Sequence, residues 1–278
     1  MRTWLITGSS SGLGRALAAA VLKRGDNVVL AARTPADVDD LGSEYPETTL
    51  IQKLDVTDSE QILATVSAAV ARFGAVDVLV NNAGYGYRAA VEEGDDDDVR
   101  RLFDTHVFGS VALIKAVLPQ MRARRSGTIV SVSSVGTQLT PAGSGYYVAA
   151  KAAVEALTGS LRKELLPLGI HAMTVEPGAF RTDFSGRSLS QSARALPDYA
   201  ETAGLRRKEN DSSSGTQPGD PAKAALVILA AVDAATPPPL LALGSDALSA
   251  RKKAMEATTA TLESWHEMSM HTDLDSEA

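Results

Sequence analysis

The chain has no cysteine among its 278 residues. This absence excludes disulfides, thiolate chemistry and cysteine-ligated metal sites, and it permits an intracellular location. A basic excess is also absent, because 27 Lys and Arg against 34 Asp and Glu give a net charge of −7. Proteins with a general nucleic-acid surface usually carry a basic patch, so we expect no nucleic-acid partner. No metal site is expected either.

Long apolar runs and targeting segments are missing as well. The longest apolar run near the C-terminus, residues 224–231, is too short to span a bilayer. The opening sequence MRTWLITG is typical of a strand that enters a turn rather than of a signal peptide. We therefore expect no membrane partner and a cytoplasmic location. The 44% of apolar residues is enough for a globular protein with a real core.

The sequence alternates apolar, β-rich runs with helical patterns. This alternation is typical of βαβ units and of a parallel sheet that is covered on both faces. Right-handed crossovers then give a doubly wound sheet. We predict an α/β fold, a single Rossmann-like domain with a sheet of about seven strands. The expected strands cover residues 3–6, 27–31, 49–54, 76–80, 128–132, 171–175 and 240–243, and the expected helices cover residues 13–23, 59–72, 99–122 and 149–166.

This single domain, residues 1–278, is expected to have three parts. Residues 1–184 form the cofactor and catalytic core, residues 185–220 form a substrate lid and a mobile loop, and residues 221–278 form the last helix–strand unit and a C-terminal helix. The loop is placed at residues 206–220, which are polar and rich in Ser, Gly and Pro.

Two further segments stand out. The acidic run at residues 95–98 precedes a helix, and a helix N-terminus, which favours carboxylates, is preferred over a metal site. The C-terminal helix has an apolar stripe, and packing on its own domain is favoured over a partner interface. The stripe consists of Leu248, Met255, Leu262 and Trp265.

A glycine-rich turn follows the first strand and opens the first helix. Glycines allow a tight turn and close approach to a pyrophosphate, and the helix N-terminus offers free N–H groups and a positive dipole. We predict a dinucleotide site here, although a plain turn would also use Gly and Ser. Its residues are Gly8, Ser10, Ser11, Gly12, Leu13 and Gly14.

The end of the second strand indicates which dinucleotide is bound. An NAD site usually has a carboxylate there, but Arg33 follows the strand and the next carboxylate is Asp37. Arg33, with help from Arg15, could pair with the 2′-phosphate of NADP(H), although two solvated arginines are the alternative. Asp55, with Val56 beside it, is expected either to bind the adenine amino group or to cap the next helix.

Two further groups of residues complete the site that the sequence predicts. Asn82, Ala83 and Gly84 follow the fourth strand, where small residues let a flat ligand lie against the backbone. Tyr147 and Lys151 lie four residues apart, on one face if the segment is helical. A nearby ammonium stabilises a phenolate and lowers its pKa, so this pair can serve as a general acid/base for a carbonyl or an alcohol.

Together these motifs resemble the short-chain dehydrogenase/reductase family, closely over residues 1–185 and loosely beyond. The extended C-terminus resembles a bacterial branch of that family. The motifs are TGSSSGLG at 7–14, NNAG at 81–84, the serine pair at 133–134, YVAAK at 147–151, and Pro177-Gly178 followed by Thr182.

The resemblance implies a role for each matching residue. Tyr147 exchanges a proton with the substrate oxygen, Ser134 binds that oxygen, and Lys151 lowers the tyrosine pKa and binds the nicotinamide ribose. Pro177, Gly178 and Thr182 hold the nicotinamide end, and the NNAG motif lines the adenosine side. Ser133 is the weaker serine candidate, because alternation along a strand points it the other way.

One residue departs from the family pattern. His106 stands where relatives carry an Asn that helps to hold a water in the proton relay behind the lysine. His106 could substitute through its carbonyl or its ring, which would add a group titrating near ~6.5, or it could weaken the relay.

We therefore expect an NADP(H)-dependent oxidoreductase that interconverts an apolar ketone or aldehyde and an alcohol, with residues 185–204 as the substrate lid. A catalytically weak nucleotide-sensing protein is the alternative, and dehydration or epimerisation is less favoured. Long helices such as 99–122 and 149–166 form dimer interfaces in many relatives, so a homodimer is possible. The surroundings of the substrate pocket are expected to include Leu139, Pro141, Tyr146, Phe180, Phe184, Leu189 and Tyr199.

Overall fold

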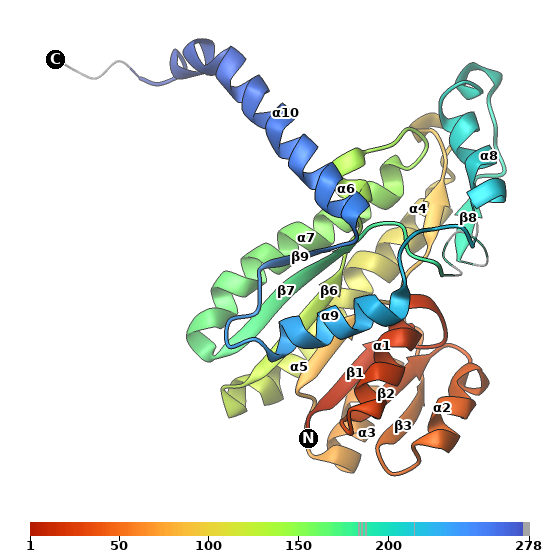
Figure 1. The fold of residues 1–278 in the computed structure, drawn as a ribbon, viewed down its shortest axis with the longest axis vertical. Coiled ribbons are helices and arrows are strands. Elements are labelled where there is room, and N and C mark those ends of the chain that lie inside the picture. The colour runs from red at the N-terminus through yellow and green to blue at the C-terminus, as the bar shows by residue number, and fades with distance from the viewer. Residues whose placement is uncertain (183, 185, 187, 214, 275–278) are drawn as a thin grey trace.

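The computed structural model describes residues 1–182, 184, 186, 188–213 and 215–274. Seven parallel strands form one sheet in the order β3-β2-β1-β4-β6-β7-β9 (Figure 1). This arrangement confirms the predicted doubly wound sheet. The strands are β1 (Thr3–Thr7), β2 (Asn27–Ala32), β3 (Thr49–Lys53), β4 (Val78–Asn81), β6 (Gly127–Val132), β7 (Ile170–Pro177) and β9 (Leu240–Leu243).

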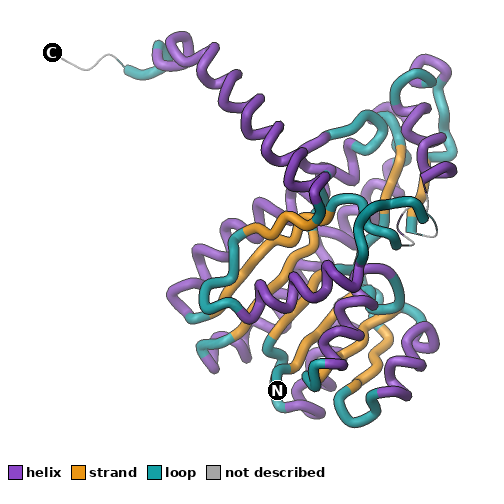
Figure 2. The backbone as a smooth tube through the Cα atoms, in the orientation of Figure 1, coloured by secondary structure: helices purple, strands orange, loops and turns teal. Residues whose placement is uncertain are grey.

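Helices cover both faces of this sheet (Figure 2). Strand β1 is buried on both sides, so its neighbouring residues face different cores: Ile6 packs in one apolar cluster and Leu5 in the other. The helices are α1 (Gly12–Lys23), α2 (Asp39–Glu44), α3 (Ser59–Phe73), α4 (Asp96–Phe103), α5 (Gly109–Arg124), α6 (Gly136–Leu139), α7 (Gly145–Leu165), α8 (Ala203–Ser213), α9 (Pro221–Asp233) and α10 (Ser245–Met270).

The two cores define the layers. Helices α1 and α9 supply Leu17, Val21 and Ile228 to the core on one face. On the opposite face, α3 and α5 supply Val66 and Val117, and α7 contributes at its C-terminal end. The chain crosses between the two faces after β3 and continues in β4, on the other side of β1. The carboxyl ends of β1 and β4 therefore border the crevice in which such sheets bind ligands.

The helical stretch Asp96–Arg124 is interrupted by a π-helical turn, η3 (Asp104–Phe108). At its start the Asp95 carboxylate accepts hydrogen bonds from the N–H groups of Asp97 and Asp98, so the acidic run is a helix N-terminus, as expected. Within the part of the chain that the structure describes, this is the one helix long and apolar enough to cross a membrane by length and composition alone. Here it packs against α3, α7 and the sheet.

Two expectations about the C-terminal half are wrong. Residues up to Ser213, expected in a mobile loop, belong to α8, because the segment is rich in helix-forming Leu, Arg, Lys and Glu. The second concerns α10, which was expected to pack on its own domain. In the structure it projects away from the body (Figure 1), and only Ala247 and Ala250 near its start are buried.

A second, two-stranded sheet ties residues from the C-terminal half to the catalytic half. Strand β5 (Gly86–Arg88) pairs in parallel with β8 (Leu189–Gln191). The predicted lid begins at Ser185, which lies outside the described residues. We refer to residues 189–213, which include β8, the 3₁₀ helix η6 (Pro197–Tyr199) and α8, as the cap segment.

Candidate functional site

The turn between β1 and α1 requires its glycines. Gly8 and Gly12 have φ values of +66° and +55°, in the left-handed region that favours glycine. A Cβ on Gly14 would lie 2.4 Å from the Asn82 side-chain nitrogen and 2.5 Å from the Gly8 carbonyl oxygen. Ser11, the N-cap of α1, makes no side-chain capping bond. The N–H groups of the first helical turn are therefore available to the phosphates of a dinucleotide.

Hydrogen bonds join the end of β4 to this turn. The Asn82 side chain donates to the carbonyl oxygens of Thr7 (2.9 Å) and Gly8 (3.3 Å). The Thr7 hydroxyl oxygen accepts from the N–H groups of Asn82 (3.0 Å) and Ala83 (2.9 Å). These four bonds hold the two strand ends together at the crevice. Asn82 therefore has a structural task in addition to lining the predicted site.

A cavity of about 750 Å³ lies at the carboxyl ends of the strands. Of the residues that the sequence assigns to catalysis or cofactor binding, all except Gly14 and Arg15 line this cavity, and Gly14 packs behind the turn. These lining residues are Gly8, Ser10, Ser11, Gly12, Leu13, Arg33, Asp55, Val56, Asn82, Ala83, Gly84, His106, Ser134, Tyr147, Lys151, Pro177, Gly178 and Thr182. The glycine-rich turn, the N-terminus of α1 without a side-chain cap and the volume of this cavity fit a nicotinamide dinucleotide.

The two arginines near the adenosine end differ in position. Arg33 is exposed and lines the cavity, and no ion pair among the described residues involves it. Arg15 forms an ion pair with Asp40 and donates to the Asp37 carbonyl, and it does not line the cavity. The expectation that Arg15 helps Arg33 is therefore not supported by this geometry.

Asp55 does not cap a helix. The N-cap of α3 is Asp58, whose carboxylate accepts from the N–H groups of Glu60 and Gln61. Asp55 instead accepts from both the N–H and the hydroxyl of Thr57, at 3.0 and 2.8 Å, and its side chain lines the cavity. Of the two alternatives for Asp55, the capping one is wrong, because the helix begins three residues later than a cap at Asp55 requires.

The catalytic candidates come together where α7 crosses the end of β6. Tyr147 and Lys151 occupy one face of α7, and the Lys151 Nζ lies 5.9 Å from the centre of the Tyr147 ring. Lys151 donates to the Val132 carbonyl at 2.8 Å, which fixes its ammonium at the strand end. The Ser134 hydroxyl accepts from the Gly136 N–H at 3.0 Å and lies close enough to the Tyr147 phenol to lower its pKa. Ser133 points away and donates to Glu155 at 2.6 Å.

Burial controls the proton affinities of this pair. It raises the pKa of Tyr147 to about 12, while the Ser134 hydrogen bond and the Arg88 charge act in the opposite direction. It also lowers the pKa of Lys151 to about 8, against the opposing charge of Glu155. The pKa of the Tyr147 phenol therefore lies above its ordinary value despite the predicted influence of Lys151. Desolvation outweighs the charge effect, and Tyr147 holds its proton at neutral pH.

His106 lies in η3 and is almost fully buried. Its Nε2 is 2.8 Å from the Tyr85 carbonyl oxygen, and its ring meets Tyr147 edge-on with centroids 5.7 Å apart. Burial and the charge of Lys151 hold the pKa of His106 well below its usual value, although the Tyr85 hydrogen bond opposes them. The expected group titrating near ~6.5 is therefore absent, and the imidazole is neutral at pH 7.

The carbonyl of His106 is also engaged, because it accepts from the Ser110 hydroxyl at 2.8 Å. The ring Nδ1 is buried and has no hydrogen-bond partner among the described residues. A Cβ on Gly84 would lie 2.3 Å from the His106 ring, so the glycine of the NNAG motif is required by this bulky neighbour. The sequence alone could not reveal this contact.

Sequence reasoning missed Arg88, in β5. It is buried, donates to the Ser144 hydroxyl at 2.5 Å, and its charge favours the ionised form of Tyr147. The available signal was a lone arginine inside the small, apolar run GYRAA. A charged residue in such a run is expensive to bury and is therefore a candidate for a functional role.

A layer of charged groups lies behind Lys151. Glu155 accepts from Ser133 and from Thr137, at 2.6 and 2.9 Å. Arg251, near the base of α10, donates to the fully buried Glu176 at 2.7 Å and lies 4.0 Å from Glu155. This arginine links α10 to the carboxylate whose charge acts on Lys151.

The substrate side of the cavity is only partly as predicted. Phe180, Phe184 and Leu189 line it, and the Phe184 ring lies 5.6 Å from the Tyr147 ring. The other expected residues contribute elsewhere: Tyr146 donates to the Val91 carbonyl and Tyr199 to the Glu92 carboxylate, and neither lines the cavity. Leu139 and Pro141 do not line it either.

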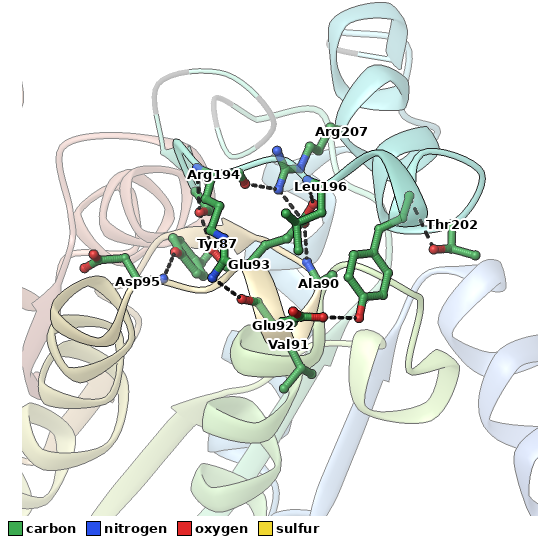
Figure 3. Close-up of polar contacts among 12 residues, drawn as sticks. Tyr87, Ala90, Val91, Glu92, Glu93, Asp95, Arg194, Leu196, Thr202 and Arg207 are labelled. Carbon is green, nitrogen blue, oxygen red and sulfur yellow. Dashed lines mark hydrogen bonds and ion pairs between the residues drawn. The ribbon is translucent and has the colours of Figure 1, made fainter.

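Glu93 connects the cap segment to the body (Figure 3). It lies in the 3₁₀ helix η2 (Val91–Glu93) and is 3% exposed. Its carboxylate accepts from the N–H groups of Ala90 (2.9 Å) and Leu196 (2.8 Å) and from the Arg207 guanidinium (2.6 Å). Burial alone would raise the pKa of Glu93, but these donors lower it below its usual value, so the carboxylate is ionised at neutral pH.

Comparison with known proteins finds relatives over nearly the whole chain. A family model described as short chain dehydrogenase matches residues 2–193. The oxidoreductase BOA17 of Botryotinia fuckeliana is 38% identical over 270 residues, which cover 97% of this chain and 98% of that protein. A 3-ketodihydrosphingosine reductase of Bacteroides thetaiotaomicron is 35% identical over 217 residues, which cover 77% of this chain and 78% of that protein.

Among solved structures, the crystal structure of a short-chain dehydrogenase from Streptomyces avermitilis matches with a TM-score of 0.91 and 44% identity. The match covers 98% of this chain and 100% of that chain. This coverage leaves only a few residues outside the alignment, so most of α10 has a counterpart in that structure.

Proposed function

This chain belongs to the short-chain dehydrogenase family and is an NAD(P)-dependent oxidoreductase, and from that premise we propose that it interconverts a ketone or aldehyde and the corresponding alcohol with NADP(H). One observation carries the proposal. Tyr147, Ser134 and Lys151 line the same cavity as the glycine turn and the open N-terminus of α1. A proton donor and a dinucleotide-binding turn therefore line one cavity, as carbonyl reduction requires.

Each residue has a task in the reducing direction. The bound nicotinamide supplies the hydride. Ser134 donates a hydrogen bond to the carbonyl oxygen, and Tyr147 delivers its phenolic proton to that oxygen as the alcohol forms. A pKa of about 12 keeps this proton in place at neutral pH until it is needed. The charges of Lys151 and Arg88 stabilise the phenolate that remains, and the reverse sequence oxidises the alcohol.

The preference for NADP(H) rests on Arg33. Its guanidinium is exposed at the cavity beside Thr34, where it can pair with a 2′-phosphate. Asp37 also lines the cavity, but its backbone carbonyl accepts from Arg15, and it lies four residues beyond Arg33. We infer that the phosphate contact of Arg33 outweighs any contact of Asp37 with an unphosphorylated ribose.

The substrate we propose is an apolar carbonyl compound or alcohol. The Phe184 ring lies 5.6 Å from the Tyr147 ring, and Phe184 and Leu189 line the same cavity as Tyr147 and offer aromatic and aliphatic surface. A relative with 35% identity is named as a reductase of a ketone, 3-ketodihydrosphingosine, which supports the same reaction class for this chain.

The test is a steady-state assay of NADPH oxidation with a panel of aliphatic and aromatic ketones. Tyr147→Phe removes only the proton donor and should lower kcat by about 10²–10⁴-fold. Tyr146→Phe is the matched control, because its hydroxyl bonds the Val91 carbonyl outside the cavity, and it should stay within a few-fold of the wild type. Equal rates for the two variants would refute the role of Tyr147. NADPH binding without turnover on any substrate would favour the alternative, a nucleotide-sensing protein.

A further inference from the structure

Helix α10 leaves a set of large apolar side chains uncovered. It has 26 residues and extends away from the rest of the molecule (Figures 1 and 2). Its large apolar side chains are each more than half exposed: Leu248, Met255, Leu262, Trp265, Met268 and Met270. Contiguous exposed apolar surface of this kind marks an interaction site.

These side chains follow the spacing of a helix that pairs with another helix. Leu248, Met255 and Leu262 recur every seven residues, which places them along one face. Trp265 follows Leu262 by three residues and lies on the neighbouring ridge of the same face. A shallow groove at Leu248 and Met255 is lined by residues of α10 alone, so no other described part of the chain covers this part of the face.

The charges of α10 indicate what the partner is. Lys252 lies beside the apolar face near the base of the helix, and Glu263 lies beside the same face further along, and both line the groove. At 1.5 Å per residue they lie about 17 Å apart. Two copies of α10 in antiparallel orientation place Lys252 of each copy near Glu263 of the other. A parallel pair would place like charges together, which is unfavourable.

We propose that α10 is a self-association surface, on which two copies of this chain pair antiparallel about a two-fold axis near Thr258 and Thr259. Such an interface is isologous, so each contact occurs twice. Met255 of one copy then packs against Leu262 of the other, and the small threonines lie where the helices approach most closely. This pairing does not depend on the reaction that the enzyme catalyses.

Cysteine cross-linking tests the pairing, because the chain has no cysteine of its own. Thr258→Cys lies near the axis and should form a disulfide-linked dimer under mild oxidation, since bonded cysteines need Cα atoms within about 7 Å. Leu248→Cys lies about 30 Å from its own symmetry mate and should not cross-link with itself. It should cross-link in an equal mixture with Ser269→Cys. Glu47→Cys, a highly exposed position outside α10, measures random collision.

Charge exchange provides a second test by sedimentation equilibrium of the full chain. Lys252→Glu should weaken self-association by about threefold, and adding Glu263→Lys to the same chain should restore it. Trp265 is a fluorescent reporter, because the other tryptophan, Trp4, is fully buried. Its emission should shift to shorter wavelength as protein concentration rises.

Three results would overturn the proposal. The first is no cross-linking of Thr258→Cys above the Glu47→Cys background. The second is equal self-cross-linking at Leu248, Thr258 and Ser269, which indicates a parallel pair. The third is an emission shift that depends on added phosphatidylcholine–phosphatidylglycerol vesicles and not on protein concentration, which indicates a membrane surface as the occupant.

Discussion

Replacement of Glu93 by glutamine directly tests how the cap segment is held. The carboxylate is 3% exposed and has three donors, two backbone N–H groups and the Arg207 guanidinium, whose side chain is itself only 16% exposed. The glutamine side chain is not charged, and its amide NH₂ must face one of these donors. Breaking a buried ion pair by changing one partner costs about 3–5 kcal/mol.

The protein can avoid most of this loss of stability by a local change in the cap segment. Its contacts with the body can open locally while the sheet stays folded. A loss of about 3 kcal/mol corresponds to a population of the open form that is roughly a hundredfold larger. We therefore expect Glu93→Gln to raise KM for apolar ketones more than it lowers kcat, because Leu189 at the start of the cap segment lines the substrate side of the cavity.

Limited trypsin digestion measures the open population, since the cap segment contains Arg194, Arg206 and Arg207 as cleavage sites. Cleavage within the segment should accelerate up to about a hundredfold in Glu93→Gln. The matched control is Glu92→Gln, an adjacent and exposed carboxylate that accepts from Tyr199. Equal cleavage rates and equal KM values for the two variants would refute the reasoning.

Three other changes have defined outcomes. Arg33→Ala should raise the Kd of NADPH at least tenfold and leave that of NADH within twofold in binding titrations, with Arg15→Ala as the control; a parallel change for both cofactors contradicts the NADP(H) assignment. Lys151 has a pKa of about 8 when folded and ~10.4 when unfolded, so the unfolded chain binds more protons between these values. In the wild type this difference should raise the free energy of unfolding by up to about 1.4 kcal/mol per pH unit between pH 8 and 10. Lys151→Met should abolish this rise in urea titrations. An unchanged slope in the variant contradicts the pKa assigned to Lys151. His106→Asn should leave the shape of the kcat/KM profile between pH 6 and 8 unchanged, because the imidazole is neutral throughout; loss of a limb near pH 6.5 in the variant would show that His106 titrates there.

The sheet and the glycine-rich, dinucleotide-binding turn could be predicted because their sequence patterns are short and local. The central strands β1, β2 and β4 are buried on both faces, and Gly8 and Gly12 have backbone angles that favour glycine. Asp95 occupies a helix N-cap, where its side-chain oxygen satisfies free N–H groups. In each case the physical reason lies within a few residues of the signal, so the sequence contains it.

The predictions that failed, and the residue that was missed, concern properties set by contacts between distant parts of the chain. The pKa values of Tyr147, Lys151 and His106 depend on burial by distant elements, which no local pattern states. The apolar stripe of α10 predicted a packed helix, but a stripe reveals only that a partner surface is expected, not whether the same chain supplies it. Arg88 was overlooked because its role depends on the three-dimensional proximity of β5 and α7.

The anchoring of α10 by Arg251 has a practical consequence for handling this enzyme. Arg251 compensates the fully buried Glu176 and lies beside Glu155, whose charge acts on Lys151. A chain shortened before residue 251 would lose more than a projecting helix, because two carboxylates would remain without their cation and the lysine would become more basic. Kinetic constants from such a truncation would describe an electrostatically different active site.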